Sequence, residues 1–265
     1  MIAIDLSGKT ALVSGSSEGI GLGIAIRLAE AGAKVIVNGR HQEKLDKAIT
    51  EVKKAAPESE VVGFVGDLGN AEGCDALIKA HPSCDILVNN VGIFNPQSDF
   101  FDTDDACWQN FFDINVMSGV RLSRAYAKDM AKRGWGRVIF IASESAFNIP
   151  VEMVHYGFSK TAQVAIARGL AKSLAGSGVT VNSVLPGPTL SEGMKKLLEP
   201  TVKKTGRSYE DVAAEFTKTA RSSSIIQRAA SVEEVANMVL YAASPFASAT
   251  TGASLRVEGG ILNYL

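Results

Sequence analysis

The sequence contains little cysteine. Its three cysteines, Cys74, Cys84 and Cys107, are an odd number, and their spacing matches neither a zinc site nor a disulfide framework. This pattern argues against the class of small proteins held together by disulfides, and it predicts three reduced thiols. It also gives no reason to expect a bound metal ion.

An excess of one charge and long apolar runs are missing as well. The chain has 27 basic and 28 acidic residues, a net charge of -1 and no prominent Lys/Arg cluster, so a nucleic-acid partner is not expected. No apolar run approaches the length of a membrane span, and residues 1–8 lack the charged and apolar regions of a signal peptide. We expect a soluble, cytoplasmic protein without a membrane partner.

Apolar residues, 46% of the 265, form short runs that alternate with longer helical patterns. The runs are apolar on successive residues, as in parallel strands covered on both faces, and they occupy 10–13, 35–37, 61–65, 86–88, 138–141, 179–184 and 254–257. The helical patterns occupy 20–31, 42–56, 71–80, 104–133, 154–175 and 232–243. This alternation predicts a single α/β domain over residues 1–265. It would be a doubly wound Rossmann fold, with a seven-stranded parallel sheet and helices on both faces.

A long connection over residues 186–228 interrupts this alternation. It is rich in Lys, Glu, Ser and Thr, with scattered apolar residues such as Met194 and Leu198, and it predicts one or two helices. A connection of this length in a compact domain is usually functional or disordered. We expect residues 189–228 to form a lid over a substrate at the carboxyl edge of the sheet.

The stretch from Gly15 to Gly21 has three glycines in the spacing GxxxGxG, between the first predicted strand and the first predicted helix. Glycines allow a tight turn and a close approach to a pyrophosphate, whose negative charge the helix N-terminus attracts. This context predicts a dinucleotide site. A glycine-rich turn without a ligand is the alternative.

The end of the second predicted strand indicates which dinucleotide to expect. An acidic residue there would bind the ribose 2′-hydroxyl and repel a 2′-phosphate, but Asn38, Gly39 and Arg40 occupy this position. Arg40 is placed to pair with a 2′-phosphate. Glu18 disfavours a 2′-phosphate, because it adds negative charge near the same pocket. We favour NADP over NAD, and a solvent-exposed loop arginine is the alternative for Arg40.

Tyr156 and Lys160 lie one turn apart on a predicted helix and therefore share a face. A fixed ammonium favours the phenolate, so we expect Lys160 to lower the pKa of Tyr156 and make it a general acid/base. The same helix has an apolar stripe that we expect to be its buried anchor, formed by Val154, Phe158, Ala162, Ile166, Leu170 and Leu174.

In these motifs, the chain resembles the smaller soluble branch of the short-chain dehydrogenase/reductase family over essentially its whole length. Asp67 looks like the family's adenine-contacting acid, and Asn89-Asn90-Val91-Gly92 is similar to its NNAG turn. Pro186-Gly187 matches the turn that faces the nicotinamide. The catalytic set implied by the resemblance is Asn115, Ser143, Tyr156 and Lys160.

The resemblance implies hydride transfer between a nicotinamide cofactor and a carbonyl or carbinol carbon. Ser143 would hydrogen-bond the carbonyl oxygen, Tyr156 would protonate it, and Lys160 would hold the nicotinamide ribose. Asn115 would help to hold a water chain. The residues expected to bind the cofactor are Gly15, Ser17, Glu18, Gly19, Ile20, Gly21, Asn38, Arg40, Asp67, Leu68, Asn90, Val91, Gly92, Tyr156, Lys160, Pro186, Gly187 and Thr189.

Residues that follow strand ends or precede Tyr156 are candidates for the substrate pocket. They are mostly apolar, which fits a small or medium ketone or secondary alcohol, and they are Ile93, Phe94, Glu144, Phe147 and Met153, with His155 and Thr189 beside them. Glu144 either recognises a polar or cationic substrate group or points at solvent, and we favour solvent. We expect His155 to be a structural neighbour and not a second base.

Two other functions remain open on the same fold. One is a non-catalytic dinucleotide-binding or regulatory protein, and the other is a lyase or epimerase that uses the same tyrosine and a bound cofactor.

The family assembles through helices that correspond to 104–133 and 154–175, and the tail 261–265 is apolar. We therefore expect a homotetramer or a homodimer.

Overall fold

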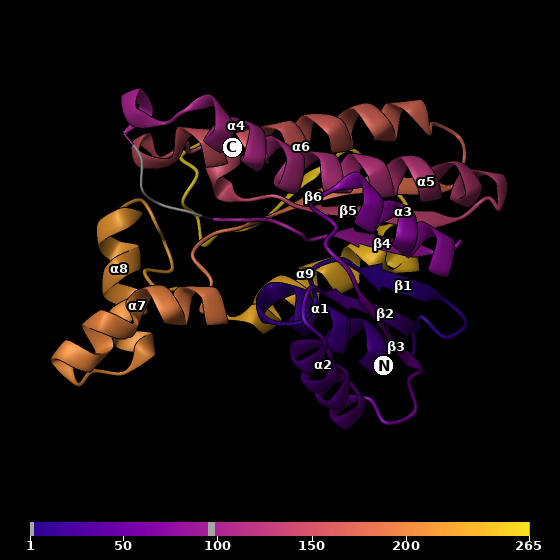
Figure 1. Ribbon diagram of the computed structural model, residues 1–265, viewed down its shortest axis with the longest axis horizontal. Helices are drawn as coiled ribbons and strands as arrows, with labels where there is room; N and C mark the ends of the chain where they lie inside the picture. The colour runs from indigo at the N-terminus through magenta and orange to yellow at the C-terminus, as the bar shows by residue number, and fades with distance from the viewer. Residues whose placement is uncertain (1–2, 95–98, 265) are drawn as a thin grey trace.

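In the computed structural model, which describes residues 3–94 and 99–264, seven strands form one parallel sheet in the order β3-β2-β1-β4-β5-β6-β7 (Figure 1). The predicted seven-stranded parallel sheet is confirmed. Leu265, the end of the predicted apolar tail, lies outside the described residues. The strands are β1 (Thr10–Val13), β2 (Lys34–Gly39), β3 (Val61–Val65), β4 (Ile86–Asn89), β5 (Gly136–Ile141), β6 (Val179–Pro186) and β7 (Ser254–Val257).

Helices cover both faces of the sheet. One face packs against α1 (Gly19–Glu30), α2 (Gln42–Ala55) and α9 (Val232–Ala243), and the other against α3 (Ala71–Ala80), α5 (Ser118–Lys132) and α6 (Val154–Ser173). Successive strand residues take part in different cores, since Leu12 packs on the α5 side and Val13 on the α1 side. This two-sided burial explains why the central strands are apolar on every residue.

The predicted helix 104–133 is interrupted by a wider turn. It consists of α4 (Asp105–Phe111), a π-helical turn (Phe112–Met117) and α5. Turns of this kind inside α-helices are frequent at functional sites. Asn115 lies within the turn, with its side chain fully buried. The helical period of the sequence does not reveal this change of pitch.

The predicted polar edge of α6 is buried, and its predicted apolar stripe is only partly buried. Its buried residues include His155, Ser159, Lys160 and Gln163, whereas the predicted apolar stripe is half-buried and Phe158 in it is 41% exposed. Ile166, Leu170 and Leu174 of the stripe pack against the core, whereas Phe158 is exposed, so the predicted anchor is confirmed only for the second half of the helix. The polar residues face inward because each of Ser159, Lys160 and Gln163 has hydrogen-bond partners there.

The long connection forms two helices, as predicted, α7 (Glu192–Thr205) and α8 (Tyr209–Ala220), which project from one end of the sheet (Figure 1). Leu198, Val212 and Ala213 form a small core of their own between them. A single bridge between Thr189 and Ala230 joins the two ends of this segment.

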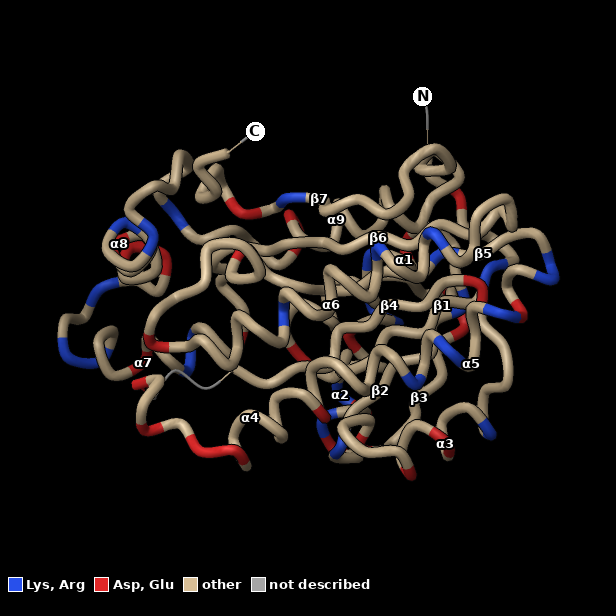
Figure 2. The backbone as a smooth tube through the Cα atoms, turned by 90° about the horizontal axis from the view of Figure 1, so that it is seen from above, with Lys and Arg blue, Asp and Glu red and all other residues tan. Residues whose placement is uncertain are grey.

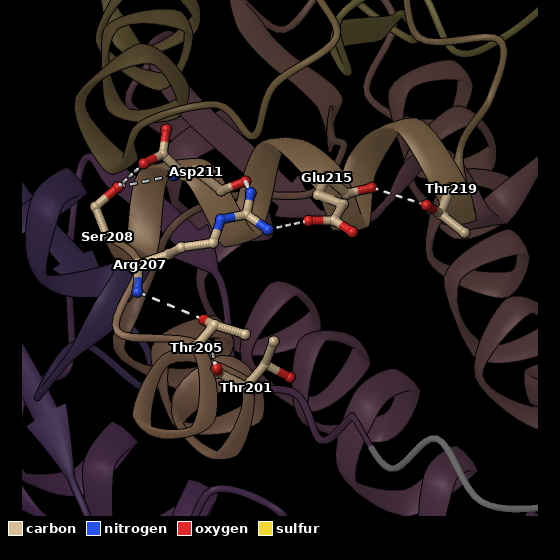
Figure 3. A network of polar contacts seen from close by, with 7 residues as sticks. All are labelled: Thr201, Thr205, Arg207, Ser208, Asp211, Glu215 and Thr219. Carbon is tan, nitrogen blue, oxygen red and sulfur yellow. Dashed lines mark hydrogen bonds and ion pairs between the residues drawn. The ribbon is translucent and has the colours of Figure 1, made fainter.

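Polar contacts fix the turn between α7 and α8 (Figure 3). Gly206 ends α7 in the left-handed conformation, with φ of 67°. The Ser208 hydroxyl caps α8 by accepting a hydrogen bond from the Asp211 N–H at 3.1 Å. Arg207 forms an ion pair with Glu215, near the middle of α8. The two helices are therefore held as a defined hairpin.

Basic and acidic residues are interspersed along the backbone, in the α7–α8 hairpin as in the rest of the chain (Figure 2). The three cysteines are free thiols, and burial raises the pKa of Cys74 to about 11. Within the described residues, no group of three or more His, Cys, Asp or Glu side chains could hold a metal ion. None of the helices in this part of the chain is both long and apolar enough to cross a membrane.

Candidate active site

The glycine-rich turn needs glycine for two different reasons. Gly15 and Gly19 have φ of 61° and 64°, in the left-handed region that favours glycine. Gly21 lies so close to the turn that a Cβ there would be 2.4 Å from the Gly15 carbonyl oxygen and 2.5 Å from Asn90 Nδ2. Glu18 at the N-cap of α1 makes no side-chain capping bond. The first turn of α1 can therefore accept a phosphate, and these residues fit the pyrophosphate of a dinucleotide.

Ser14 and Asn90 join this turn to the end of β4. The Ser14 hydroxyl donates to the Val88 carbonyl at 3.2 Å and accepts from the N–H groups of Asn90 and Val91 at 2.9 and 3.1 Å. Asn90 Nδ2 donates to the carbonyls of Ser14 and Gly15. Asn90 therefore shapes the glycine-rich turn through its side chain.

Asn38 has a similar structural role at the end of β2. Its side chain is buried, Oδ1 accepts from the Gly15 N–H at 3.0 Å, and Nδ2 donates to the carbonyls of Phe64 and Gly66. The amide of Asn38, a predicted cofactor-binding residue, is thus engaged within the protein. Beyond β3, Asp67 is exposed and its Oδ1 accepts from a backbone N–H at 2.9 Å, whereas Leu68 is buried in the core.

The predicted conflict between Glu18 and Arg40 is resolved by two lysines. Glu18 pairs with Lys44 of α2 at 2.8 Å and with Lys196 of α7 at 3.6 Å. The hydrogen bond from Lys44 lowers the pKa of the Glu18 carboxyl. Arg40 is exposed and forms no ion pair within the described part of the chain. Glu192 Oε2 also lies at the glycine-rich turn, 3.6 Å from the position of a Cβ on Gly19, so basic and acidic groups both border this region.

Ser143 and Tyr156 meet beyond the carboxyl end of β5. Ser143 Oγ accepts from the Ser145 N–H at 3.1 Å, and Tyr156 lies in the first turn of α6 with its ring 5.3 Å from that of Phe94. Burial raises the pKa of Tyr156 to about 12, and hydrogen bonding with Ser143 offsets part of this rise. The predicted net lowering of the Tyr156 pKa was wrong for this structure, because burial outweighs any effect of the Lys160 charge.

Lys160 is buried, and its Nζ lies 5.6 Å from the centre of the Tyr156 ring. The ammonium donates to the Ile141 carbonyl at 2.9 Å and to Gln163 Oε1 at 3.2 Å. Burial lowers the pKa of Lys160 to about 8. A methyl group placed on Gly92 would lie 3.5 Å from Lys160 Nζ, so the ammonium is next to the turn after β4.

Asn115 ties the π-helical turn to the same region. Its Oδ1 accepts from the Ile93 N–H at 2.7 Å, and its Nδ2 donates to the Ile93 carbonyl and to Ser159 Oγ. Its backbone carbonyl accepts from Gln163 Nε2 at 2.6 Å. Gln163, whose role the sequence reasoning missed, thus links Lys160 to Asn115. The available signal was a polar residue three positions after Lys160, on the same helix face.

The remaining cofactor candidates lie beside β6 and β7. Pro186 ends β6, and the Gly187 N–H donates to the Val257 carbonyl at 3.0 Å. A Cβ on Gly187 would meet the Glu258 backbone at 2.9 Å, which accounts for the glycine. Thr189 is buried, and its hydroxyl donates to the Gly187 carbonyl at 3.0 Å.

The substrate candidates are spread around Tyr156. Phe94 packs against its ring, Met153 is buried just before α6, and Phe147 is partly exposed and contacts Tyr264 with ring centres 5.8 Å apart. Ile93 is held by Asn115. His155 is buried against Phe111 and Trp108, as expected of a structural neighbour.

Glu144 does not point at solvent, so the favoured interpretation of this residue was wrong. Its side chain is 3% exposed and forms an ion pair with Arg221, which follows α8, at 2.7 Å. Burial raises the pKa of Glu144 in spite of this partner. Sequence reasoning missed Arg221 because 77 positions separate the two residues.

Comparison with known proteins decides the family, since residues 9–201 match the short chain dehydrogenase family. The chain belongs to the short-chain dehydrogenase/reductase family. It is 47% identical to the uncharacterized oxidoreductase YvaG of Bacillus subtilis over 98% of each chain. It is 33% identical to dehydrogenase/reductase SDR family member 4 of Bos taurus, over 98% of this chain and 89% of that protein.

Among solved structures, this short-chain dehydrogenase is similar to the L-sorbose reductase of Gluconobacter frateurii complexed with NADPH and L-sorbose. The TM-score is 0.91 and the identity 30%, over 100% of both chains. The protein is therefore an NAD(P)-dependent oxidoreductase with a Rossmann fold. The residues at its glycine-rich turn fit the nicotinamide cofactor that this family uses.

Proposed function

We propose that this short-chain dehydrogenase interconverts a ketone and a secondary alcohol, with Tyr156 as the general acid/base. The observation that carries the proposal is the convergence of Ser143, Tyr156 and Lys160 beyond β5, beside the Gly92 turn. When bound, the nicotinamide cofactor supplies or accepts the hydride. The protein has to orient the reacting carbon and move one proton.

In the reducing direction, the residues manage the charge that develops on the carbonyl oxygen. A pKa of about 12 keeps Tyr156 protonated at neutral pH, so the phenol is ready to donate its proton. The Ser143 hydroxyl accepts a backbone N–H and hydrogen-bonds Tyr156, and it would donate to the same carbonyl oxygen once a substrate is bound. The cationic Lys160 is 5.6 Å from the Tyr156 ring and favours the phenolate that results.

Lys160 and Gln163 form the inner part of the site. The Lys160 ammonium, next to Gly92, would hold the hydroxyls of the nicotinamide ribose. Gln163 orients this ammonium through Oε1 and binds the Asn115 carbonyl through Nε2. The Gln163 side chain therefore connects Lys160 to the backbone carbonyl of Asn115.

We propose NADP as the preferred cofactor. Arg40 is exposed at the tip of β2, and two lysines pair with Glu18, so Arg40 would be available to pair with a 2′-phosphate. The similarity to the L-sorbose reductase solved with NADPH supports this choice.

The organisation we propose is one domain over residues 1–265, with residues 189–228 as a lid over the substrate. The ion pairs of Lys196 with Glu18 and of Arg221 with Glu144 support the lid, since both connect it to the predicted site.

We propose a homotetramer or homodimer formed through α4, α5 and α6. The half-buried apolar stripe of α6, with Phe158 most exposed, supports this interface.

A panel of ketones and secondary alcohols, followed through the absorbance of the reduced nicotinamide with NADPH/NADP and with NADH/NAD, tests this proposal. We expect turnover of some ketones and alcohols, with NADP preferred. Cofactor binding without any turnover would favour a non-catalytic dinucleotide-binding protein. Product formation without net cofactor consumption would favour a lyase or epimerase.

A further inference from the structure

The ion pair between Glu144 and Arg221 lies where a substrate would contact the protein. Glu144 directly follows Ser143, and Arg221 leaves the end of the α7–α8 hairpin. The charge of Glu144 raises the pKa of Tyr156 and that of Arg221 lowers it, as expected of charges in the region of the tyrosine. Their side chains are 3% and 12% exposed, so water screens the pair poorly.

The carboxylate of Glu144 is only half used. Oε1 accepts from Arg221 Nε at 2.7 Å, whereas Oε2 is buried and has no hydrogen-bond partner within the described residues. A buried carboxylate oxygen without a donor is costly, and such atoms in native proteins usually have a functional explanation. Oε2 is therefore suited to accept a hydrogen bond from a ligand.

Arg221 is anchored from behind, which fixes the position of the pair. Its Nη1 donates to the Ala220 carbonyl at 2.8 Å. The residues that follow it are joined to the segment after β7, through Ser223 Oγ to the Ile261 carbonyl at 2.7 Å and the Ile225 N–H to the Gly259 carbonyl at 2.8 Å. The acceptor is thus held rigidly at the site.

The charge of the pair selects the kind of donor. Arg221 already pairs with Glu144, and the nearby Glu258 accepts from the N–H groups of Ile261 and Leu262, so a buried cationic substrate group would find no free carboxylate as its partner. A neutral hydroxyl can donate to Oε2 without that cost. We propose that Glu144, held by Arg221, is a subsite for a hydroxyl on the carbon next to the reacting carbonyl, so that the substrates are hydroxyketones and the corresponding diols. This proposal rests on the ketone/alcohol function proposed above.

Hydroxyacetone and butanone test the subsite, because they differ only by a hydroxyl in place of a methyl group. With NADPH, we expect the wild type to show a kcat/KM at least about tenfold higher for hydroxyacetone. The test variant is Glu144→Leu combined with Arg221→Met, which removes both buried charges together and leaves neither unpaired. We expect it to lower the hydroxyacetone-to-butanone ratio at least about tenfold. Glu234→Gln is the matched control, because it disrupts the more exposed pair with Arg228 and should leave the ratio unchanged.

Equal ratios in the wild type and the double variant would overturn the subsite and leave the pair with a structural role only. The same two ligands are also titrated into NADP-loaded protein by calorimetry. Tighter binding of hydroxyacetone to the wild type than to the double variant supports the subsite, even if neither ligand is turned over. Tighter binding without turnover would contradict the proposed ketone/alcohol reaction and would leave the subsite supported. Equal binding of the two ligands by the wild type contradicts the subsite whatever the turnover.

Discussion

Replacement of Gly21 by alanine should weaken cofactor binding far more than the addition of a single methyl group suggests. The added Cβ would lie 2.4 Å from the Gly15 carbonyl oxygen, and a normal contact requires the turn to move by at least about 0.6 Å. Overpacking of this kind typically costs about 1–3 kcal/mol, which in a chain of this size lowers Tm by roughly 2–4 °C per kcal/mol. The displaced atoms belong to the proposed pyrophosphate site. We therefore expect the Kd for NADPH to rise at least about tenfold, or about 1.4 kcal/mol.

Gly169→Ala is the matched control for this substitution. Gly169 lies in the interior of α6, and a Cβ there would meet no atom within 4 Å. Alanine should raise the free energy of unfolding by about 0.5–1 kcal/mol and leave NADPH binding unchanged. Thermal melts and titrations of NADPH fluorescence on both variants provide the comparison. Wild-type affinity for NADPH in Gly21→Ala would refute the assignment of this turn to the cofactor.

Four further predictions concern the cofactor pocket, the inner site and the assembly. Arg40→Ala should raise the KM for NADPH about tenfold to a hundredfold and change the KM for NADH less than about twofold. Equal changes for both cofactors would contradict the pairing of Arg40 with the 2′-phosphate. In the wild type, kcat/KM for NADPH should fall above a pH of about 8, since the pKa of Lys160 is lowered to that value and the ribose needs the ammonium. Gln163→Leu removes a hydrogen-bond acceptor from the Lys160 ammonium, so the decline of kcat/KM should begin roughly one pH unit lower. An unshifted pH profile would contradict the role of the Lys160–Gln163 hydrogen bond. Phe158→Asp places a charge on the exposed α6 stripe and should yield smaller assemblies by light scattering, whereas a monomeric wild type would refute the interface.

Local sequence patterns were sufficient for the sheet and for the glycine-rich turn. Each central strand is apolar on successive residues because two helical layers cover it, and that pattern is visible in the sequence. Three glycines of the turn could be identified because the reasons for them are local. Gly15 and Gly19 have positive φ, and Gly21 lies close to the Gly15 carbonyl oxygen. The order of the motifs along the chain then indicated the family.

The environment of the catalytic candidates could not be predicted in the same way. The burial that raises the pKa of Tyr156 depends on Phe94 and Phe111, which are distant in the sequence. The first part of α6 buries polar residues and exposes Phe158, because Lys160 and Gln163 find hydrogen-bond partners inside the protein. The partner of Glu144 comes from the far end of the α7–α8 hairpin. Such pairings become visible only in three dimensions.

The central claim is that the Tyr156 hydroxyl transfers the proton that accompanies hydride transfer. Its most direct test is the rate of NADPH oxidation by Tyr156→Phe with a ketone that the wild type reduces, measured on protein shown to bind NADPH. Tyr241→Phe, at an exposed position on α9, is the control. We predict wild-type NADPH affinity and a kcat at least about a hundredfold lower for Tyr156→Phe, with an unaffected control. A Tyr156→Phe enzyme that reduces the ketone at the wild-type rate would contradict the account.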